Sequence, residues 1–482
     1  MLDLRPVFFV CGLLLITVAV VMAVPAIADF AVGHADWQVF GVSALLTLFV
    51  GGLLILMNRT QAPRLTVRQA FLLTVATWTA IAAFGALPFA FSELGMSYTD
   101  AFFESMSGIT TTGSTVIAGL DEAPPGILLW RSLLQWMGGI GIIAVAIVIL
   151  PMLQVGGMQL FRMESSDTSE KVMPRVAQIA SGIGFCYVTL SAVCALLYWA
   201  AGMSAFDAVN HAMTTIATGG YSTSDASIGN YDSAAVDAVA TVFMLLGALP
   251  FALYVQALRG KPMILLRDSQ VRWFLAIVCG GILALTVWVA QIYDISPFLA
   301  FRYAAFNVVS IITGTGYSSI NYGEWGGFAM AAFFLFMFIG GCAGSTACGI
   351  KVFRYQILYE TARTQIARLM QPHGVFIPYF NGRPISEEVT SSVMAFFFFF
   401  VATFWALTLV LSMLGLDFLT SVSGAAATLA NVGPGLGDVI GPAGTFESLP
   451  DAAKWVLAAG MLLGRLELYT VLVLFAPTFW RG

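Results

Sequence analysis

Runs of apolar residues about as long as a lipid bilayer is thick constrain the fold of this chain more than any other feature. An apolar stretch of about 18 or more residues with few charges indicates a membrane-spanning helix. Lipid offers no hydrogen-bond partner to backbone amides, so each such segment must satisfy its own amides as a helix. Full-length spans are expected over residues 6–28, 38–57, 68–92, 127–153, 176–200, 236–258, 271–293, 327–350, 389–415 and 453–476. The predicted fold class is therefore an all-α polytopic membrane protein.

Composition supports this class and argues against several others. Only 10% of the 482 residues are charged, whereas a soluble domain carries about 25%. The apolar run after Arg5 is longer than the roughly 7–15 residues of a signal-peptide core, so we interpret it as the first span. The six cysteines show no CxxC spacing and the three histidines lie far apart. No disulfide framework, metal cluster or organic cofactor is therefore expected.

The charged residues between the spans predict the orientation of the chain. Basic residues occupy alternate loops: Arg59, Arg64, Arg68, Arg162, Lys171, Arg175, Arg259, Lys261, Arg267, Arg272, Lys351, Arg354, Arg363, Arg368 and Arg383. The opposite loops carry acidic residues with almost no bases: Asp29, Asp36, Asp121, Glu122, Asp225, Asp232, Asp294, Glu324, Asp438 and Glu447. The positive-inside rule places the basic loops and both termini in the cytosol.

Four of the connections on the acidic side share one pattern. Each contains a short amphipathic stretch of about 12 residues followed by a patch of threonine, glycine and serine. The four read YTDAFFESMSGITTTGSTV, AFDAVNHAMTTIATGGYST, FLAFRYAAFNVVSIITGTGYSS and FLTSVSGAAATLANVGPGLG. Their glycines align at Gly113, Gly220, Gly316 and Gly433, which are 107, 96 and 117 residues apart. Self-similarity at comparable spacing indicates one repeated unit, here a span, a half-helix, a polar loop and a span.

The repeated unit has the properties of one quarter of an ion pore. A helix of about 12 residues rises only about 18 Å, roughly half a bilayer. Irregular backbone can follow it at membrane depth only where it lines a water-filled cavity. Glycine and small polar residues there allow carbonyl groups to face a dehydrated cation. Four units around one axis predict a selectivity filter, and the alternative is a set of re-entrant or external loops with a purely structural role.

These motifs resemble the Trk/Ktr/HKT superfamily of potassium transporters. The resemblance rests on TTTGS, TGGYS, GTGYS and NVGPGLG, together with GGCAGSTACGIK and the late GRLELY, and it covers essentially the whole chain. It is strongest to the TrkH branch, the membrane subunits of bacterial Trk systems, which has two extra N-terminal spans. The resemblance implies four membrane–pore–membrane repeats in pseudo-fourfold symmetry, a homodimer, and residence in the bacterial inner membrane. The implied divisions are a two-helix extension (1–60) and pore repeats 61–155, 156–260, 261–383 and 384–482, the third with a broken second helix.

The resemblance also implies which residues bind the transported K⁺. The expected filter residues are Thr111, Thr112, Gly113, Thr218, Gly219, Gly220, Gly314, Thr315, Gly316, Asn431, Val432 and Gly433. Relatives that favour Na⁺ tend to carry serine at the first signature glycine, so glycine at 113 argues for K⁺. Gly314 stands where the family often has threonine. Glu104, His211 and Asn307 each lie nine residues before a signature glycine, and they either brace the filter or are satisfied polar residues of a half-helix.

The segment GGCAGSTACGIK (340–351) interrupts the predicted eighth span. It is not a phosphate-binding loop, because Ile350 separates Gly349 from Lys351 and no strand precedes it. Close helix packing through small residues is one interpretation. Glycine at this density is costly inside a helix, which favours an unwound loop instead. The resemblance makes this loop the intramembrane gate, with Gly340, Gly341, Gly344, Ser345, Thr346, Gly349 and Lys351 as its residues.

Arg465 is an isolated cation in the last predicted span. Such charges are rare, face a cavity or a partner, and cost at least about 2.5–3.5 kcal/mol at the helix centre. A salt bridge to Glu467 is the simple explanation, but residues two apart do not face each other on a helix. We therefore predict that Arg465 faces the pore and bonds carbonyls of the broken segment. Arg131 and Arg302 lie nearer the outer ends and are expected to brace pore helices.

Together these features predict a K⁺ uptake pathway gated from the cytosol. The family pairs this subunit with a cytosolic nucleotide-binding ring of the TrkA type, and segments 351–383 and 259–272 are candidate contacts. The alternative is a secondary symporter that couples K⁺ to H⁺ or Na⁺. An enzyme is not expected, because the chain lacks a Ser/His/Asp set, paired intramembrane aspartates and HExxH. No nucleic-acid partner is expected.

Overall fold

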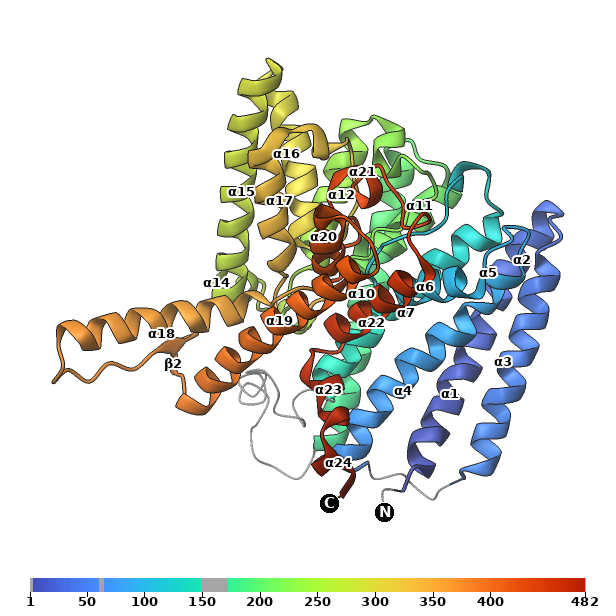
Figure 1. Cartoon of the computed structure of the whole chain (residues 1–482), viewed down its shortest axis with the longest axis horizontal. Helices are drawn as coiled ribbons and strands as arrows, with labels where there is room; N and C mark the ends of the chain where they lie inside the picture. The colour runs from blue at the N-terminus through green and yellow to red at the C-terminus, as the bar shows by residue number, and fades with distance from the viewer. Residues whose placement is uncertain (1–2, 60–64, 149–171, 482) are drawn as a thin grey trace.

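The computed structural model describes residues 3–59, 65–148 and 172–481, and 72% of it is helical. The predicted boundaries near residues 60 and 155, the end of span 127–153, and the bases Arg64, Arg162 and Lys171 lie outside these ranges. Within them, the β structure named consists of a two-stranded hairpin, β1 (Tyr379–Phe380) and β2 (Arg383–Pro384). Most of the helices form one bundle, from which α18 (Val352–Met370) and the hairpin project, and the N- and C-termini lie next to each other at one end of the bundle (Figure 1).

The N-terminal extension is a pair of tightly crossed spans. Helices α1 (Arg5–Val21) and α2 (Ala23–Val32) form one nearly continuous span, which packs against α3 (Trp37–Met57). At the crossing, a Cβ on Gly12 would lie 2.7 Å from the Gly51 carbonyl oxygen, and a Cβ on Gly51 would lie 2.9 Å from the Gly12 oxygen. Glycine on both helices therefore permits this approach, as expected where lipid-embedded helices pack through small residues.

Four units of the same design follow this extension. The first contains α4 (Val67–Gly85), α5 (Leu87–Phe91), α6 (Tyr98–Ile109), η1 (Leu120–Glu122) and α7 (Pro125–Val148). The second contains α10 (Val172–Ala200), α11 (Ala205–Ile216), η2 (Ser227–Tyr231), α12 (Ala234–Gly247) and α13 (Phe251–Leu258). The third contains α14 (Ile264–Arg267), α15 (Ser269–Tyr293), α16 (Pro297–Ile312), η3 (Tyr322–Glu324), α17 (Gly326–Phe338) and α18 (Val352–Met370). The fourth contains α19 (Glu387–Met413), α20 (Phe418–Leu429), α21 (Gly437–Ile440), α22 (Asp451–Arg465), α23 (Tyr469–Leu472), η4 (Val473–Phe475) and α24 (Pro477–Arg481).

The second helix of three units is interrupted, and two of these interruptions correct the sequence analysis. By length and composition, seven helices in the described ranges can cross a membrane, or nine if each bent pair is one span. The predicted span 236–258 bends by 93° between α12 and α13, where Pro250 precedes α13. The predicted span 453–476 bends by 109° between α22 and α23, where Glu467 and Leu468 have positive φ. The predicted break in span 327–350 begins after Phe338, where α17 ends.

The short helices α6, α11, α16 and α20 each run from a capped N-terminus to a buried C-terminus. Each begins with a side chain that caps the third backbone amide of the helix: Ser97, Ser204, Ser296 and Asp417. Three of the helices have 12 residues, as expected, and α16 has 16. Their C-terminal halves are buried, so the loops that follow them meet inside the protein.

Candidate functional site

The loops that follow the four short helices have the same backbone conformation. We call residues 111–113, 218–220, 314–316 and 431–433 the four ring loops. The first residue of each is left-handed, with φ of 53° at Thr111, 51° at Thr218, 72° at Gly314 and 52° at Asn431. The third residue of each is the signature glycine, with φ between 76° and 105°. Gly314, which departs from the family pattern, therefore occupies a position where glycine is the least strained residue.

Each ring loop is fixed to its own short helix in the same way. The amide of the second loop residue bonds a helix carbonyl five residues earlier: Thr112 to Ser107 at 2.9 Å, Gly219 to Thr214 at 2.9 Å, Thr315 to Ser310 at 2.9 Å and Val432 to Ala427 at 2.8 Å. These hydrogen bonds satisfy the amide of the second residue in each loop, and they do not involve the carbonyl groups of the loops. The four loops are therefore structural equivalents, although their sequences differ.

The four ring loops close on one another in cyclic order. A Cβ on Gly113 would lie 2.3 Å from the Gly219 oxygen, and one on Gly220 would lie 1.8 Å from the Thr315 oxygen. A Cβ on Gly316 would lie 2.2 Å from the Val432 oxygen, and one on Gly433 would lie 2.9 Å from the Thr112 oxygen. Each signature glycine thus abuts the carbonyl of the next repeat, and the fourth returns to the first. Such a ring can surround a dehydrated cation with carbonyl oxygens.

A cavity of 260 Å³ lies against one side of this ring. All four signature glycines line it, and among the residues that the structure describes the charged side chains of its lining are Asp225 and Arg131. The first residues of the ring loops are not among the described residues of this lining, and all four are buried. The glycine end of the ring therefore faces the cavity, and the Thr111 end points into the protein.

The three polar residues that precede the signature glycines by nine positions hold the chain just beyond the ring. Glu104 is fully buried and accepts bonds from the Val116 amide at 3.0 Å and from Arg131 Nε at 2.8 Å. His211 Nε2 lies 3.0 Å from Ser222 Oγ, and Asn307 Nδ2 donates to Ser319 Oγ at 3.0 Å. These contacts agree with the bracing interpretation. The fourth repeat has Gly424 at the equivalent position, and so has no such side chain.

The predicted bracing roles of the two outer arginines also have counterparts in the structure. Arg131 joins Glu104 in an ion pair whose two side chains are at most 1% exposed, and its guanidinium carbon lies 4.0 Å from the centre of the Tyr221 ring. Arg302, on α16, bonds Asp237 on α12 through Nε at 2.7 Å. Both arginines therefore connect neighbouring repeats: Arg131 connects the first to the second, and Arg302 connects the third to the second.

Residues 339–351 form an irregular loop at the Thr111 end of the ring, which we call the crossing loop. Its two ends pair with each other, since the Gly340 amide donates to the Ile350 oxygen at 2.9 Å. At its centre, Thr346 Oγ1 lies 2.9 Å from both the Ile216 and the Gly247 carbonyl oxygens. Cys348 Sγ lies 3.6 Å from Thr111 Oγ1. The loop therefore covers the end of the ring opposite the 260 Å³ cavity.

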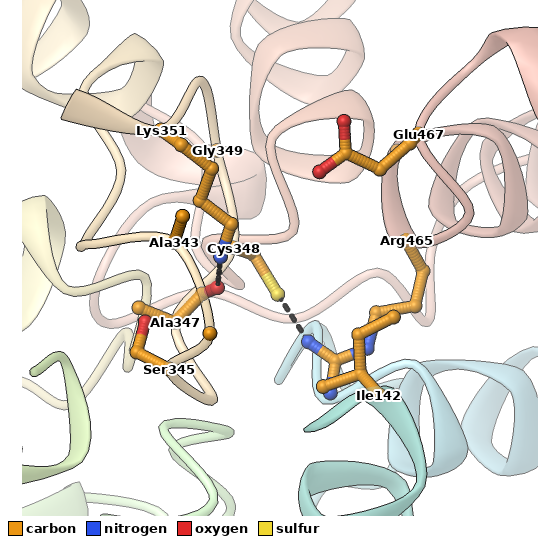
Figure 2. A pocket seen from close by; sticks show the side chains of 11 residues that line it. Ile142, Ala343, Ser345, Ala347, Cys348, Gly349, Lys351, Arg465 and Glu467 are labelled. Carbon is orange, nitrogen blue, oxygen red and sulfur yellow. Dashed lines mark hydrogen bonds between the residues drawn. The ribbon is translucent and has the colours of Figure 1, made fainter. Parts of the chain in front are cut away.

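Arg465 fastens this loop from the last repeat (Figure 2). Its Nη1 donates to the Thr346 oxygen at 3.1 Å and to Cys348 Sγ at 2.6 Å. Its Nη2 donates to the Gly138 oxygen on α7 at 3.0 Å. The side chain is 3% exposed. The guanidinium therefore connects α22, the crossing loop and α7, and bonds a loop carbonyl as the sequence analysis expected.

Glu467 has a different partner from the one considered from sequence. It forms a buried ion pair with Arg354 at the start of α18. The Arg354 guanidinium also lies over the Phe396 ring, with 3.8 Å between its central carbon and the ring centre. The sequence analysis counted Arg354 among the bases between the spans, and the structure places it on α18, where it is fully buried. The position of Arg354, close after Lys351 in the sequence, did not indicate that its side chain would be buried.

The other predicted residues of the segment are divided between two roles. Gly340 and Gly341 allow close packing, since a Cβ on Gly340 would lie 2.0 Å from the Cys348 oxygen and one on Gly341 would lie 2.9 Å from the Ala248 oxygen. Gly344, Ser345, Gly349 and Lys351 line a small cavity of 30 Å³ together with Cys348, Arg465 and Glu467. Lys351 Nζ donates to the Ala347 oxygen (Figure 2). Gln135, which bonds the second ring loop, was missed because no local motif marks it, whereas Cys348 lies inside the predicted segment but was not singled out.

Known proteins resemble this chain over its whole length. Residues 37–481 match the TrkH family, described as a cation transport protein. The Trk system potassium uptake protein TrkI of Halomonas elongata is 46% identical over 99% of this chain and 97% of its own length. The Trk system potassium uptake protein TrkH of Escherichia coli K12 is 39% identical over the full length of both chains. The crystal structure of the potassium transporter TrkH from Vibrio parahaemolyticus superposes with a TM-score of 0.92 and 37% identity, covering 99% of this chain and 100% of that one.

Proposed function

This chain belongs to the TrkH family of cation transport proteins, and from that premise we propose that it takes up K⁺ through the ring formed by its four loops. The family consists of multi-pass membrane transporters and not of enzymes. The observation that carries the proposal is the cyclic contact between each signature glycine and the carbonyl of the next repeat. A ring of backbone carbonyls replaces the hydration shell of a K⁺ ion without placing a fixed charge on the path.

The proposed K⁺ ligands are carbonyl oxygens of the four ring loops. The residues involved are Thr111–Gly113, Thr218–Gly220, Gly314–Gly316 and Asn431–Gly433. Four buried helices end at these loops, and the C-terminal end of a helix carries partial negative charge that favours a cation. Because the four loops differ in sequence, the ligands are not equivalent, and we expect weaker discrimination against Na⁺ than a ring of four identical loops would give.

The proposed gate is the crossing loop, held closed by Arg465. A guanidinium is always charged near neutral pH, so its place against the loop opposes a cation that leaves the ring on that side. Two of its three hydrogen bonds end on the crossing loop, at Thr346 and Cys348. Opening then requires the loop to move and release both bonds.

The proposed location is the bacterial inner membrane, with both termini and the crossing loop on the cytosolic side. The positions of the basic loops support this orientation. A cytosolic nucleotide-binding ring of the TrkA type is the proposed regulator, and a homodimer is the proposed assembly. Segment 351–383 is a candidate contact, because α18 follows the crossing loop directly and the segment exposes Leu369, on α18, by 82% and Val375, beyond it, by 90%. Movement of α18 would reach the gate without an intermediate element.

Ion flux into proteoliposomes tests the proposal. The purified chain is reconstituted alone, and uptake of radioactive rubidium is measured against empty liposomes, with and without H⁺ and Na⁺ gradients. We expect uptake that follows the K⁺ equilibrium potential and competes with external K⁺. Uptake that requires an H⁺ or Na⁺ gradient would favour the symporter instead. Absence of rubidium flux from both the wild type and an Arg465→Ala variant would contradict a K⁺ pathway through this chain.

A further inference from the structure

The middle residue of the second ring loop has no side chain, and its backbone conformation does not explain why. The residue before the signature glycine is Thr112, Gly219, Thr315 or Val432 in the four repeats. The left-handed glycines include Gly220, but Gly219 is not among them. An L-amino acid with a side chain could therefore adopt the backbone conformation of Gly219 without strain. Some neighbouring group must occupy the space where its Cβ would lie.

That neighbour is Gln135, which reaches the second ring loop from α7 of the first repeat. A Cβ on Gly219 would lie 2.4 Å from both Cδ and Oε1 of Gln135. Gln135 is fully buried. Its Nε2 donates to the Gly219 oxygen at 2.7 Å, and its Oε1 accepts from the Tyr221 amide at 3.0 Å. The carboxamide therefore occupies the missing side-chain position and bonds the loop on both sides of its signature glycine.

The first and third repeats fix the same position with their own side chains. Thr112 Oγ1 lies 2.7 Å from Thr110 Oγ1, and Thr315 Oγ1 lies 2.7 Å from Thr313 Oγ1. The second and fourth repeats lack this threonine pair, since they carry Ala217 with Gly219 and Ala430 with Val432. In the fourth, Asn431 Nδ2 instead donates to Thr112 Oγ1 at 2.8 Å and to the Met461 oxygen at 2.9 Å. In the second, Gln135 supplies side-chain hydrogen bonds from another repeat.

We infer that Gln135 is a positioning residue for ion selectivity, which supplies from the first repeat the side chain that the second ring loop lacks. This inference rests on the proposed function. The Gly219 oxygen lies against Gly113. The second ring loop, which Gln135 bonds, therefore also restricts the position of the first ring loop. Without the carboxamide, a stretch of two consecutive glycines loses the two bonds that fix the direction of its carbonyls. The ring then adapts more readily to the smaller Na⁺ ion.

A pair of compensating substitutions tests this inference. Gln135→Ala removes the carboxamide and should raise the permeability of Na⁺ relative to K⁺ at least about threefold, because two buried hydrogen bonds are lost. Gly219→Val copies the Ala430–Val432 pair of the fourth loop, but by itself it overlaps Gln135 and should reduce K⁺ flux. The double variant has both the side chain and the space for it, so its permeability ratio should return toward that of the wild type. Gln256→Ala, at an exposed glutamine of α13, is the control.

Reversal potentials under bi-ionic K⁺/Na⁺ conditions give the permeability ratio of each reconstituted variant. An unchanged ratio in Gln135→Ala would overturn the inference, as would a double variant no closer to the wild type than either single one. If Gln135→Ala is not monodisperse after purification, recovery of a folded and K⁺-selective double variant supports the inference, and failure to recover overturns it. Absence of K⁺ flux from both the wild type and the Arg465→Ala variant would contradict the proposed function itself, whereas a selective protein whose permeability ratio is insensitive to Gln135 contradicts only this inference.

Discussion

Serine at the signature glycines should disturb the ring to a degree that differs from repeat to repeat. All four glycines have positive φ, so a serine adds a similar backbone strain of about 1–2 kcal/mol at each. The steric overlap is not similar. Real Cβ atoms essentially never come closer than 3.0 Å to another heavy atom, and the nearest carbonyl oxygen lies at 1.8 Å for Gly220, 2.2 Å for Gly316, 2.3 Å for Gly113 and 2.9 Å for Gly433.

The size of the disturbance follows from these distances. To reach the 3.0 Å limit, serine at 220 must increase its distance from the Thr315 carbonyl oxygen by about an ångström. Serine at 433 needs an increase of only about a tenth of an ångström from the Thr112 oxygen. Displaced ring carbonyls cannot keep a spacing matched to K⁺, because selectivity depends on their number and position around the ion. We therefore expect the Na⁺ to K⁺ permeability ratio to rise most in Gly220→Ser, next in Gly316→Ser and Gly113→Ser, and least in Gly433→Ser.

Reversal potentials of the four reconstituted variants in K⁺/Na⁺ bi-ionic solutions measure this order. Gly119→Ser is the matched control, because Gly119 has a φ of 76° but no atom within 4 Å of an added Cβ. It carries the backbone strain without the overlap, and its permeability ratio should equal that of the wild type. The reasoning is refuted if Gly433→Ser loses selectivity as strongly as Gly220→Ser, or if Gly113→Ser conducts with unchanged reversal potentials.

Three further predictions follow from the contacts around the ring. Arg465→Ala removes two charged hydrogen bonds to the crossing loop, each contributing about 1.5–3 kcal/mol. Rubidium uptake without a partner should therefore rise at least about tenfold, with Arg465→Lys intermediate. Unchanged or lower uptake in a folded protein would contradict the proposal that Arg465 holds the crossing loop closed. Glu104→Gln leaves its buried arginine partner without a counter-charge, which should cost about 3–5 kcal/mol and lower the unfolding temperature in detergent, while Asp232→Asn, at an 86% exposed partner, should change it little; equal shifts would contradict a buried ion pair. Gly340→Ala should impair purification yield because its Cβ would lie 2.0 Å from a carbonyl, whereas Gly344→Ala, in open space, should cost only its backbone strain; the reverse order would show that the crossing loop packs differently.

Sequence alone predicted the architecture because the physical signals for it are local. Span length, the half-length helices and the glycine in each following loop are all visible within about 20 consecutive residues. The bends after Gly247 and Arg465 were not predicted, since an apolar run reads as one span whether or not it turns. Pro250 was an available signal for the first bend. Leucine rarely adopts a left-handed conformation, so the residue type of Leu468 did not indicate the second bend.

In the candidate site, too, the residues marked by a local pattern were predicted and those defined by distant contacts were not. The signature glycines were found because each repeat carries one, and their cyclic contacts explain why a side chain is absent there. Two residues that contact the ring loops from other segments, Gln135 and Cys348, were missed. Gln135 lies 84 positions from the carbonyl it bonds, and Cys348 lies 117 positions from Arg465. Such pairs are set by how repeats pack against each other, and no spacing within one repeat encodes them.

The ring is nearly symmetric, whereas the groups that hold and cover it are not. The crossing loop comes from the third repeat alone, because α7 continues through the equivalent level and the second and fourth repeats bend there instead. The arginine that fastens the loop comes from the fourth repeat, and its remaining bond ends on Gly138 of the first. In four identical subunits, every gating residue would appear four times around the axis. In a single chain each repeat can diverge separately, so one loop and one cation suffice to cover a ring that all four repeats build. A substitution at the crossing loop should therefore change opening and leave selectivity intact, whereas one at the ring should change selectivity first.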